Sequence, residues 1–250
     1  RRRHVLLRVH AVGLSFQDVL CKLGVFTGET SATVSDAAGV VVGASAAHTV
    51  DSPVFGFVQS PLASTACAAE SLVVRKSPTL SFEQVSTLPL AWSTAHIMLQ
   101  RSELHSRHRL VIHAATGDSG LTGVEYAHWL HAHVLGTCGK PQKQIQLRLL
   151  GVRWLCSLRE TASFGFGAML LLSAGRTRAI FGARLTDGFR VTSLPLLSEG
   201  GTFVDSRTLR VPRSRQTLLL LSARVSLGAV SSLPLCSIDL EMQIELAFRI

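Results

Sequence analysis

The segment best suited to chemistry is a glycine-bearing turn at residues 115–121, which follows the apolar run 110–114. Glycine allows tight turning and close approach to a ligand, and the free amides and dipole of a helix N-terminus attract anions. Glycines recur at every third residue from Gly117, although the closely spaced first pair of G-x-G-x-x-G is missing and Asp118 adds negative charge. The turn predicts either a pyrophosphate site or an ordinary loop. As a pyrophosphate site, its contacts would be Thr116, Gly117, Asp118, Ser119, Gly120 and Leu121.

The residues after the next strand indicate which dinucleotide would bind. In an NAD site, an acidic residue about 20 positions after the glycines holds the ribose hydroxyls, and it would repel a 2′-phosphate. The segment 137–143 has no carboxylate and contains Lys140 and Lys143. The two lysines could also be ordinary solvated residues at a helix start. Their placement favours NADPH over NADH and makes both lysines candidate cofactor contacts.

The elements that must position this turn begin with a β-rich segment. Short β-type runs separated by turns fill the chain from Val5 to about Val74, and they predict a β module. Ser81 is typical of a helix N-cap, and the apolar pattern behind it predicts a helix through about Leu99.

From residue 110 onward, the expected strands and helices alternate. We predict strands at 110–114, 134–137, 179–181 and 201–204, with helices at 121–131 and 145–150. Such alternation is typical of a parallel, doubly wound sheet. Beyond Asp205 the pattern loses definition, and the segment 217–225 is compatible with either strand or helix.

The composition argues against several classes of function. The 250 residues are 47% hydrophobic and 16% charged, which fits one large or two small globular domains. The net charge is +9, but the basic residues are scattered and aromatics are scarce, so we expect no nucleic-acid partner. An anionic cofactor or a carrier-bound substrate explains the positive net charge as well as a nucleic acid would. The apolar stretches are too short for a membrane span, and a start at Arg1 suggests an excised piece of a longer protein.

Neither the cysteines nor the histidines predict a metal site. The five cysteines are widely spaced without a C-x-x-C pair, which indicates reduced thiols and a cytoplasmic protein. His128 and His131 could share a helix face, but His133 would turn away from them. His113 ends a strand, and we expect it to satisfy a backbone contact rather than to catalyse.

Six ordered blocks of the sequence resemble the enoyl reductase domains of modular polyketide synthases, which are quinone-oxidoreductase-like members of the medium-chain dehydrogenase/reductase superfamily. The similarity covers about residues 5–204. The blocks are AVGLSFQDVL (11–20), LGVF (23–26), SDAAGVV (35–41), VFG (54–56), LSFEQVSTLP (80–89) and HAATGDSGL (113–121).

The resemblance implies an α/β fold in three parts. Residues 1–96 would form a partial GroES-like β module, residues 97–210 an NADPH-binding Rossmann domain with a doubly wound parallel sheet, and residues 211–250 a divergent or truncated tail. The implied activity is that of a zinc-independent enoyl reductase. NADPH would deliver hydride to the β-carbon of an α,β-unsaturated acyl thioester on an acyl carrier protein, and neighbouring polyketide synthase domains would flank the chain.

The resemblance also implies catalytic candidates. Lys143 aligns with a family lysine near the cofactor that has been considered as a proton donor, and Glu160 falls close to a family acidic position. A lysine can serve as this donor only where burial or neighbours lower its pKa. Phe26 stands where the family often has a tyrosine that correlates with a 2S product. Because a phenyl ring delivers no proton, a 2-methyl substrate should give mainly the 2R product, unless Phe26 is only a wall of the acyl pocket.

Some residues depart from the family pattern. The family usually has two adjacent glycines and a small apolar residue around the turn where Asp118 and Ser119 stand, and the segment 182–185 replaces an Asn-Ser-Leu segment near the nicotinamide. The chain after Val204 does not match the family. Two alternatives therefore stay open: a stand-alone quinone-oxidoreductase-like enzyme, and a catalytically inactive structural domain.

Overall fold

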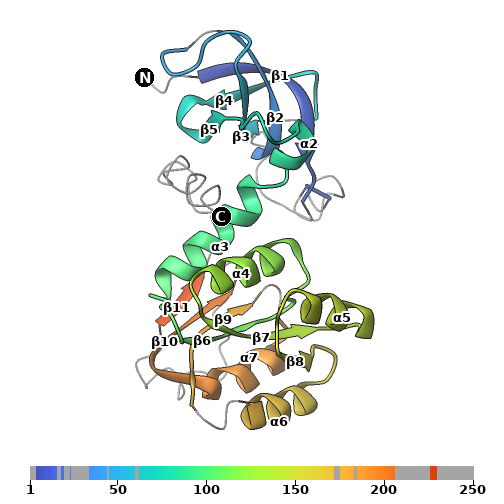
Figure 1. Cartoon of the computed structure of the whole chain (residues 1–250), viewed down its shortest axis with the longest axis vertical. Coiled ribbons are helices and arrows are strands. Elements are labelled where there is room, and N and C mark those ends of the chain that lie inside the picture. The colour runs from blue at the N-terminus through green and yellow to red at the C-terminus, as the bar shows by residue number, and fades with distance from the viewer. Residues whose placement is uncertain are drawn as a thin grey trace. The chain divides into compact units, whose positions relative to one another are not determined.

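The computed structural model divides the chain into two compact units, of which the first runs to Ser93 and the second begins at Thr94 (Figure 1). The structure describes residues 4–15, 18–19, 23, 34–43, 45–59, 62–171, 175–182, 185–205 and 226–229. Phe26 and Arg184 lie outside these residues, as does the ambiguous segment 217–225.

The first unit is an antiparallel sheet. Its strands are β1 (His4–Gly13), β2 (Val34–Gly43), β3 (Pro53–Gln59), β4 (Thr65–Ala69) and β5 (Val73–Arg75), and a short 3-10 helix, η1 (Glu70–Leu72), precedes β5. The strand order is β2-β1-β4-β3-β5, and β2 also pairs with β3, so four of the strands close on one another. The alternation of buried residues along β1, with Val5 and Leu7 inside, agrees with a strand that has one face in the core.

Two helices follow this sheet where one was predicted. In α2 (Phe82–Val85), Ser81 caps the helix and forms a reciprocal capping box with Gln84, as the Ser81 pattern indicated. The prediction of a single helix through Leu99 is wrong, because the chain turns after α2 and restarts at Pro89 as α3 (Pro89–Arg101). Proline has no N–H to donate to a preceding turn, and it disfavours helical geometry in the residue before it.

The second unit contains a six-stranded parallel sheet. Its strands are β6 (Arg109–Ile112), β7 (His133–Cys138), β8 (Trp154–Ser157), β9 (Thr177–Gly182), β10 (Leu197–Asp205) and β11 (Ser226–Ala229). They are arranged in the order β11-β10-β9-β6-β7-β8, and all neighbours pair in parallel. The chain therefore winds outward from β6 in both directions, which is the doubly wound dinucleotide-binding order. The predicted fold class, an antiparallel GroES-like module followed by a Rossmann-type sheet, is confirmed.

Helices cover both faces of the parallel sheet (Figure 1). They are α4 (Asp118–Trp129), α5 (Pro141–Leu149), α6 (Thr161–Leu171) and α7 (Asp187–Ser193), and a 3-10 turn, η2 (Leu194–Leu196), follows α7. Alternation along β6 assigns the faces: Val111 belongs to a cluster with residues of α6 and α7, and the Ile112 side chain lies beneath Gly123 of α4.

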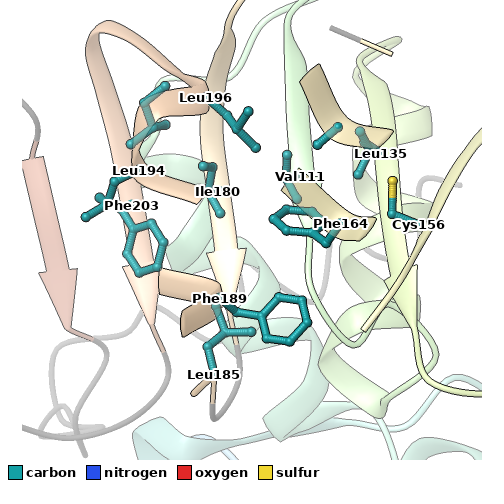
Figure 2. Close-up of a cluster of buried hydrophobic side chains, with 12 residues drawn as sticks. Val111, Leu135, Cys156, Phe164, Ile180, Leu185, Phe189, Leu194, Leu196 and Phe203 are labelled. Carbon is teal, nitrogen blue, oxygen red and sulfur yellow. The ribbon is translucent and has the colours of Figure 1, made fainter. Parts of the chain in front are cut away.

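The core between the sheet and helices α6 and α7 is apolar and aromatic (Figure 2). Phe164 of α6 and Phe189 of α7 lie with ring centroids 5.5 Å apart, beside Val111 and Ile180 of the central strands. Because the core spans β6, β7, β9 and β10, it fixes the carboxyl ends of the central strands, where the predicted site lies.

Candidate functional site

The glycine turn connects β6 to α4 in a strained conformation. Ala114 has a φ of 51°, a left-handed value that is uncommon for residues other than glycine. Gly117 is the N-cap of α4 and is exposed, with only the Ala114 carbonyl oxygen 3.3 Å from the place where a Cβ would stand. At Gly120 a Cβ would lie 2.6 Å from that oxygen and 2.8 Å from the Ala115 Cα, so the close packing of helix on turn requires glycine.

Strand β7 holds this turn through Thr137. The Ala115 N–H donates to the Thr137 carbonyl oxygen over 2.9 Å, and the Ala114 N–H donates to the Thr137 hydroxyl oxygen over 3.3 Å. The Gly117 N–H donates to the Ala114 carbonyl oxygen over 2.8 Å. These bonds fix the backbone that leads into the first turn of α4.

A pocket lies beside the turn at the point where the strand order reverses between β6 and β9. Its lining residues are Thr94, Ala95, Met98, Ile112, His113, Ser119, Gly120, Gly123, Phe181 and Gly182. In doubly wound sheets, ligands bind outside the carboxyl ends of the strands at this switch point. The structure therefore brings Ser119 and Gly120 of the predicted set to a pocket in the expected place.

Asp118 affects how this turn could receive an anion. Its carboxylate oxygen Oδ1 accepts a hydrogen bond of 2.7 Å from the Ser119 N–H, in the first turn of α4. The carboxylate interacts favourably with the positive end of the helix dipole. It also occupies a backbone donor and places a negative charge in front of the turn, which disfavours a bound anion. Thr116 and Leu121, which were also predicted as contacts, are half-buried at either end of the turn.

The predicted lysines lie at the carboxyl end of β7. Lys140 is the N-cap of α5, and Lys143 lies in the first turn of the same helix; both side chains are exposed. Burial raises the pKa of the Cys138 thiol at the end of β7, and the nearby ammonium of Lys143 acts in the opposite direction. An exposed lysine suits an anion contact better than it suits a proton donor that depends on burial.

Sequence reasoning missed a third basic residue, Arg159. Its Cγ and Nε atoms lie 4.0 Å from the place where a Cβ of Gly139 would stand, which sets the guanidinium stem beside the end of β7. The Leu158 N–H donates to the Cys138 carbonyl oxygen over 3.1 Å and holds the two strand ends together. The signal was available in principle, because a strand at 154–157 paired with β7 would have placed Arg159 just beyond its carboxyl end, next to the end of β7.

Glu160, the predicted acidic candidate, has a structural contact. Its carboxylate Oε2 accepts a 2.6 Å hydrogen bond from the Ser163 hydroxyl, and its carbonyl oxygen accepts one from the Phe164 N–H. The side chain is exposed at the start of α6. Of the segment that departs from the family near the nicotinamide, Gly182 lies at the pocket, and a Cβ there would stand 2.5 Å from the Leu185 side chain.

His113 is buried behind the turn, with two side-chain partners. Its Nδ1 lies 3.1 Å from the Thr137 hydroxyl and its Nε2 lies 2.9 Å from the Ser193 hydroxyl. Burial lowers the pKa of His113 to about 3, so the ring is neutral at physiological pH. The expectation of a backbone contact is corrected, because both ring nitrogens bind side chains.

Within the described ranges, no three His, Cys, Asp or Glu side chains are grouped so that they could hold a metal ion. In the same ranges, no helix is both long and apolar enough to cross a membrane.

Solved structures share this arrangement of an antiparallel module and a six-stranded switch-point sheet. The structure of CurK enoyl reductase matches with a TM-score of 0.87 at 24% identity, covering 98% of this chain and 79% of that chain. An Escherichia coli quinone oxidoreductase complexed with NADPH matches with a TM-score of 0.84 at 19% identity, covering 99% of this chain and 79% of that chain. The chain therefore shares its fold with an enoyl reductase and a quinone oxidoreductase of known structure.

The chain also resembles polyketide synthases in sequence. Erythronolide synthase EryA2 of Saccharopolyspora erythraea is 32% identical over 212 residues, which are 82% of this chain and 6% of that protein. The chain thus spans a small fraction of the length of this curated relative. No family model matches the chain. The resemblance to polyketide synthase enoyl reductases is confirmed: the chain is homologous to a segment of polyketide synthases and has an enoyl reductase fold.

Proposed function

We propose that the chain is an NADPH-dependent enoyl reductase domain of a polyketide synthase, which reduces an α,β-unsaturated acyl thioester carried by an acyl carrier protein. The observation that carries the proposal is the turn from Ala114 to Gly120 at the switch point of the sheet, with basic residues at the end of the neighbouring strand. Homology to a polyketide synthase segment and the enoyl reductase fold support it. Flanking synthase domains and a cytoplasmic location belong to the same proposal.

The residues present fit a dinucleotide. The exposed backbone at Gly117 leaves room for a pyrophosphate next to the N-terminus of α4. Lys140, Lys143 and Arg159 surround the end of β7, where a 2′-phosphate would lie, and residues 137–143 contain no carboxylate to repel it.

The residues of the chain would bind and orient rather than react. Bound NADPH supplies the hydride. The turn would hold the pyrophosphate, and Ala95, Met98 and Phe181 would exclude water from the pocket at the switch point. We propose Lys143 primarily as a cofactor contact, because its side chain is exposed. Glu160 remains a candidate for proton delivery, and Phe26 remains a candidate for shaping the acyl pocket. The widely spaced cysteines favour a zinc-independent reaction.

One observation favours the inactive-domain alternative. The Asp118 carboxylate occupies the Ser119 N–H and opposes an anion, so binding could be too weak to support turnover. A stand-alone quinone oxidoreductase shares the fold, and substrate preference would distinguish it from the proposed reductase.

The decisive experiment titrates NADPH and NADH into the purified chain and then measures NADPH oxidation with a 2-enoyl thioester and with a quinone. We expect NADPH to bind at least about tenfold more tightly, since one charge-assisted contact contributes about 1.5–3 kcal/mol. Arg159→Ala should raise the Kd of NADPH by about that factor and leave the Kd of NADH unchanged.

A matched control is Arg153→Ala, which removes an exposed arginine just before β8 rather than after it. Equal affinities for the two cofactors would contradict the specificity, and no binding of either would favour the inactive domain. Turnover of quinone without turnover of the thioester would favour the oxidoreductase alternative.

A further inference from the structure

His113 connects helix α7 to the glycine turn through the interior of the second unit. The ring is 2% exposed and lies edge-on to Phe164 and Phe189, with centroids 5.0 Å and 6.1 Å away. These apolar neighbours leave the Thr137 and Ser193 hydroxyls as the hydrogen-bond partners found for the ring among the described residues.

The donors and acceptors around the ring determine its tautomer. The Ser193 hydroxyl donates its one hydrogen to the Phe189 carbonyl oxygen over 2.6 Å, so toward His113 it can only accept. Nε2 therefore carries the proton. Nδ1 is then an acceptor, and the Thr137 hydroxyl donates to it. The neutral state that burial imposes on His113 agrees with this assignment.

The same hydroxyl reaches the strained residue of the turn. With its hydrogen directed at Nδ1, the Thr137 oxygen accepts the Ala114 N–H. Ala114 has left-handed geometry, which persists in a residue other than glycine only where its surroundings hold it. The Ala114 carbonyl oxygen in turn accepts the Gly117 N–H, so the orientation of Ala114 sets the N-terminus of α4.

We propose that His113 is a positioning residue for the pyrophosphate turn: as the Nε2–H tautomer, anchored on Ser193, it orients the Thr137 hydroxyl that holds Ala114. It acts through Thr137 and needs no contact with the cofactor. The inference rests on the proposed function, because the group to be positioned against the turn is the pyrophosphate of NADPH.

The test compares two probes that share one end of the cofactor. NADPH requires the turn, whereas adenosine 2′-phosphate has the 2′-phosphate and no pyrophosphate. His113→Phe keeps a ring of similar size and removes both hydrogen bonds. We expect it to raise the Kd of NADPH about tenfold, equivalent to about 1.4 kcal/mol, and to change the Kd of adenosine 2′-phosphate less than about twofold. His113→Asn offers Thr137 a carbonyl acceptor near the position of Nδ1 and should recover most of the NADPH affinity.

Three further variants guard against a general loss of folding. Thr137→Val deletes the hydroxyl at constant shape, and Thr137→Ser keeps it, so only the valine variant should lose NADPH affinity. Leu197→Ala disturbs the same buried cluster without contacting the turn, and it should affect both probes alike.

The outcomes separate the two proposals. If the unchanged chain binds adenosine 2′-phosphate but not NADPH, the proposed function fails. If it binds both, and His113→Phe and Thr137→Val weaken both probes equally or neither, the positioning role is overturned. Nitrogen-15 NMR of the unchanged chain without cofactor identifies the protonated ring nitrogen of His113, and a proton on Nδ1 would overturn the inference whatever the chain binds.

Discussion

At the scale of single residues, Asp118 determines the charge in front of the glycine turn. Its carboxylate accepts the Ser119 N–H over 2.7 Å, so one backbone donor in the first turn of α4 is already occupied from within the chain. That contact stabilises the helix, and the same charge opposes a pyrophosphate. Affinity for the cofactor and stability of α4 should therefore change in opposite directions when the charge is removed.

We predict that Asp118→Asn lowers the Kd of NADPH about twofold to fivefold, because it removes a repulsive charge at a helix N-terminus, where such charges contribute about 0.3–1 kcal/mol. The free energy of unfolding should fall by about 0.5 kcal/mol, because the favourable interaction of the carboxylate with the helix dipole is lost. Isothermal titration and denaturant unfolding measure the two quantities.

Glu125→Gln is the matched control, because Glu125 is an exposed carboxylate on the same helix, two turns further along. It should leave the Kd of NADPH unchanged. A weaker affinity in Asp118→Asn would mean that the carboxylate orders the turn more than it repels the ligand.

The sequence predicted the turn and both lysines from residue type and spacing. It missed Arg159, because its position depends on β8, a strand of four residues with one buried side chain, Cys156. It also misjudged His113, whose partners Thr137 and Ser193 are 24 and 80 residues away along the chain. Contacts over such separations depend on the fold and carry no local pattern.

At the scale of elements, two glycines of α4 have opposite packing requirements. A Cβ at Gly120 would lie 2.6–2.9 Å from backbone atoms of Ala114 and Ala115, which cannot move aside cheaply. At Gly123 the nearest atom is the Ile112 Cδ1, at an ordinary contact distance of 3.5 Å. The two positions are one turn apart on the same helix, and only one of them requires glycine.

We predict that Gly120→Ala lowers the free energy of unfolding by about 1–3 kcal/mol through overpacking. Gly123→Ala should raise it by about 0.5–1 kcal/mol, because alanine is the better helix former. Chemical denaturation of the two variants compares them directly. A stabilised Gly120→Ala variant would show that the helix and the turn leave room for a Cβ at this position.

Element boundaries followed the strength of the local pattern. The helix predicted at 121–131 is α4 at 118–129, and the strand predicted at 201–204 is the end of β10 at 197–205. Helix α6 was missed because it is apolar all round, with Phe166, Met169 and Leu170 exposed as well as Phe164 buried. Without a polar face, a helix has no period to detect.

At the scale of the whole molecule, the buried His113 makes the free energy of unfolding depend on pH. The folded state holds His113 with a pKa of about 3, against 6.5 for an unperturbed histidine. Between these values the unfolded chain binds a proton that the folded chain does not, so stability falls as the pH falls through this window.

We predict that acidification below about pH 6.5 lowers the free energy of unfolding by about 1.4 kcal/mol per pH unit from this residue alone. Burial also lowers the pKa values of His96, His108 and His128, which act in the same direction. Denaturant unfolding at several pH values measures the total slope, and His113→Phe should reduce it. An unchanged slope in the variant would contradict the assignment to His113.

The order of the strands has a consequence for how the second unit forms. Leu110 of β6 pairs with Val134 of β7, but on its other side it pairs with Ala179 of β9, which is reached only after β8 and α6 have been passed. Closing the longer loop costs more chain entropy. The half of the sheet from β6 to β8 can thus assemble from near neighbours, whereas the pocket at the switch point needs both halves, so we expect it to be completed late in folding.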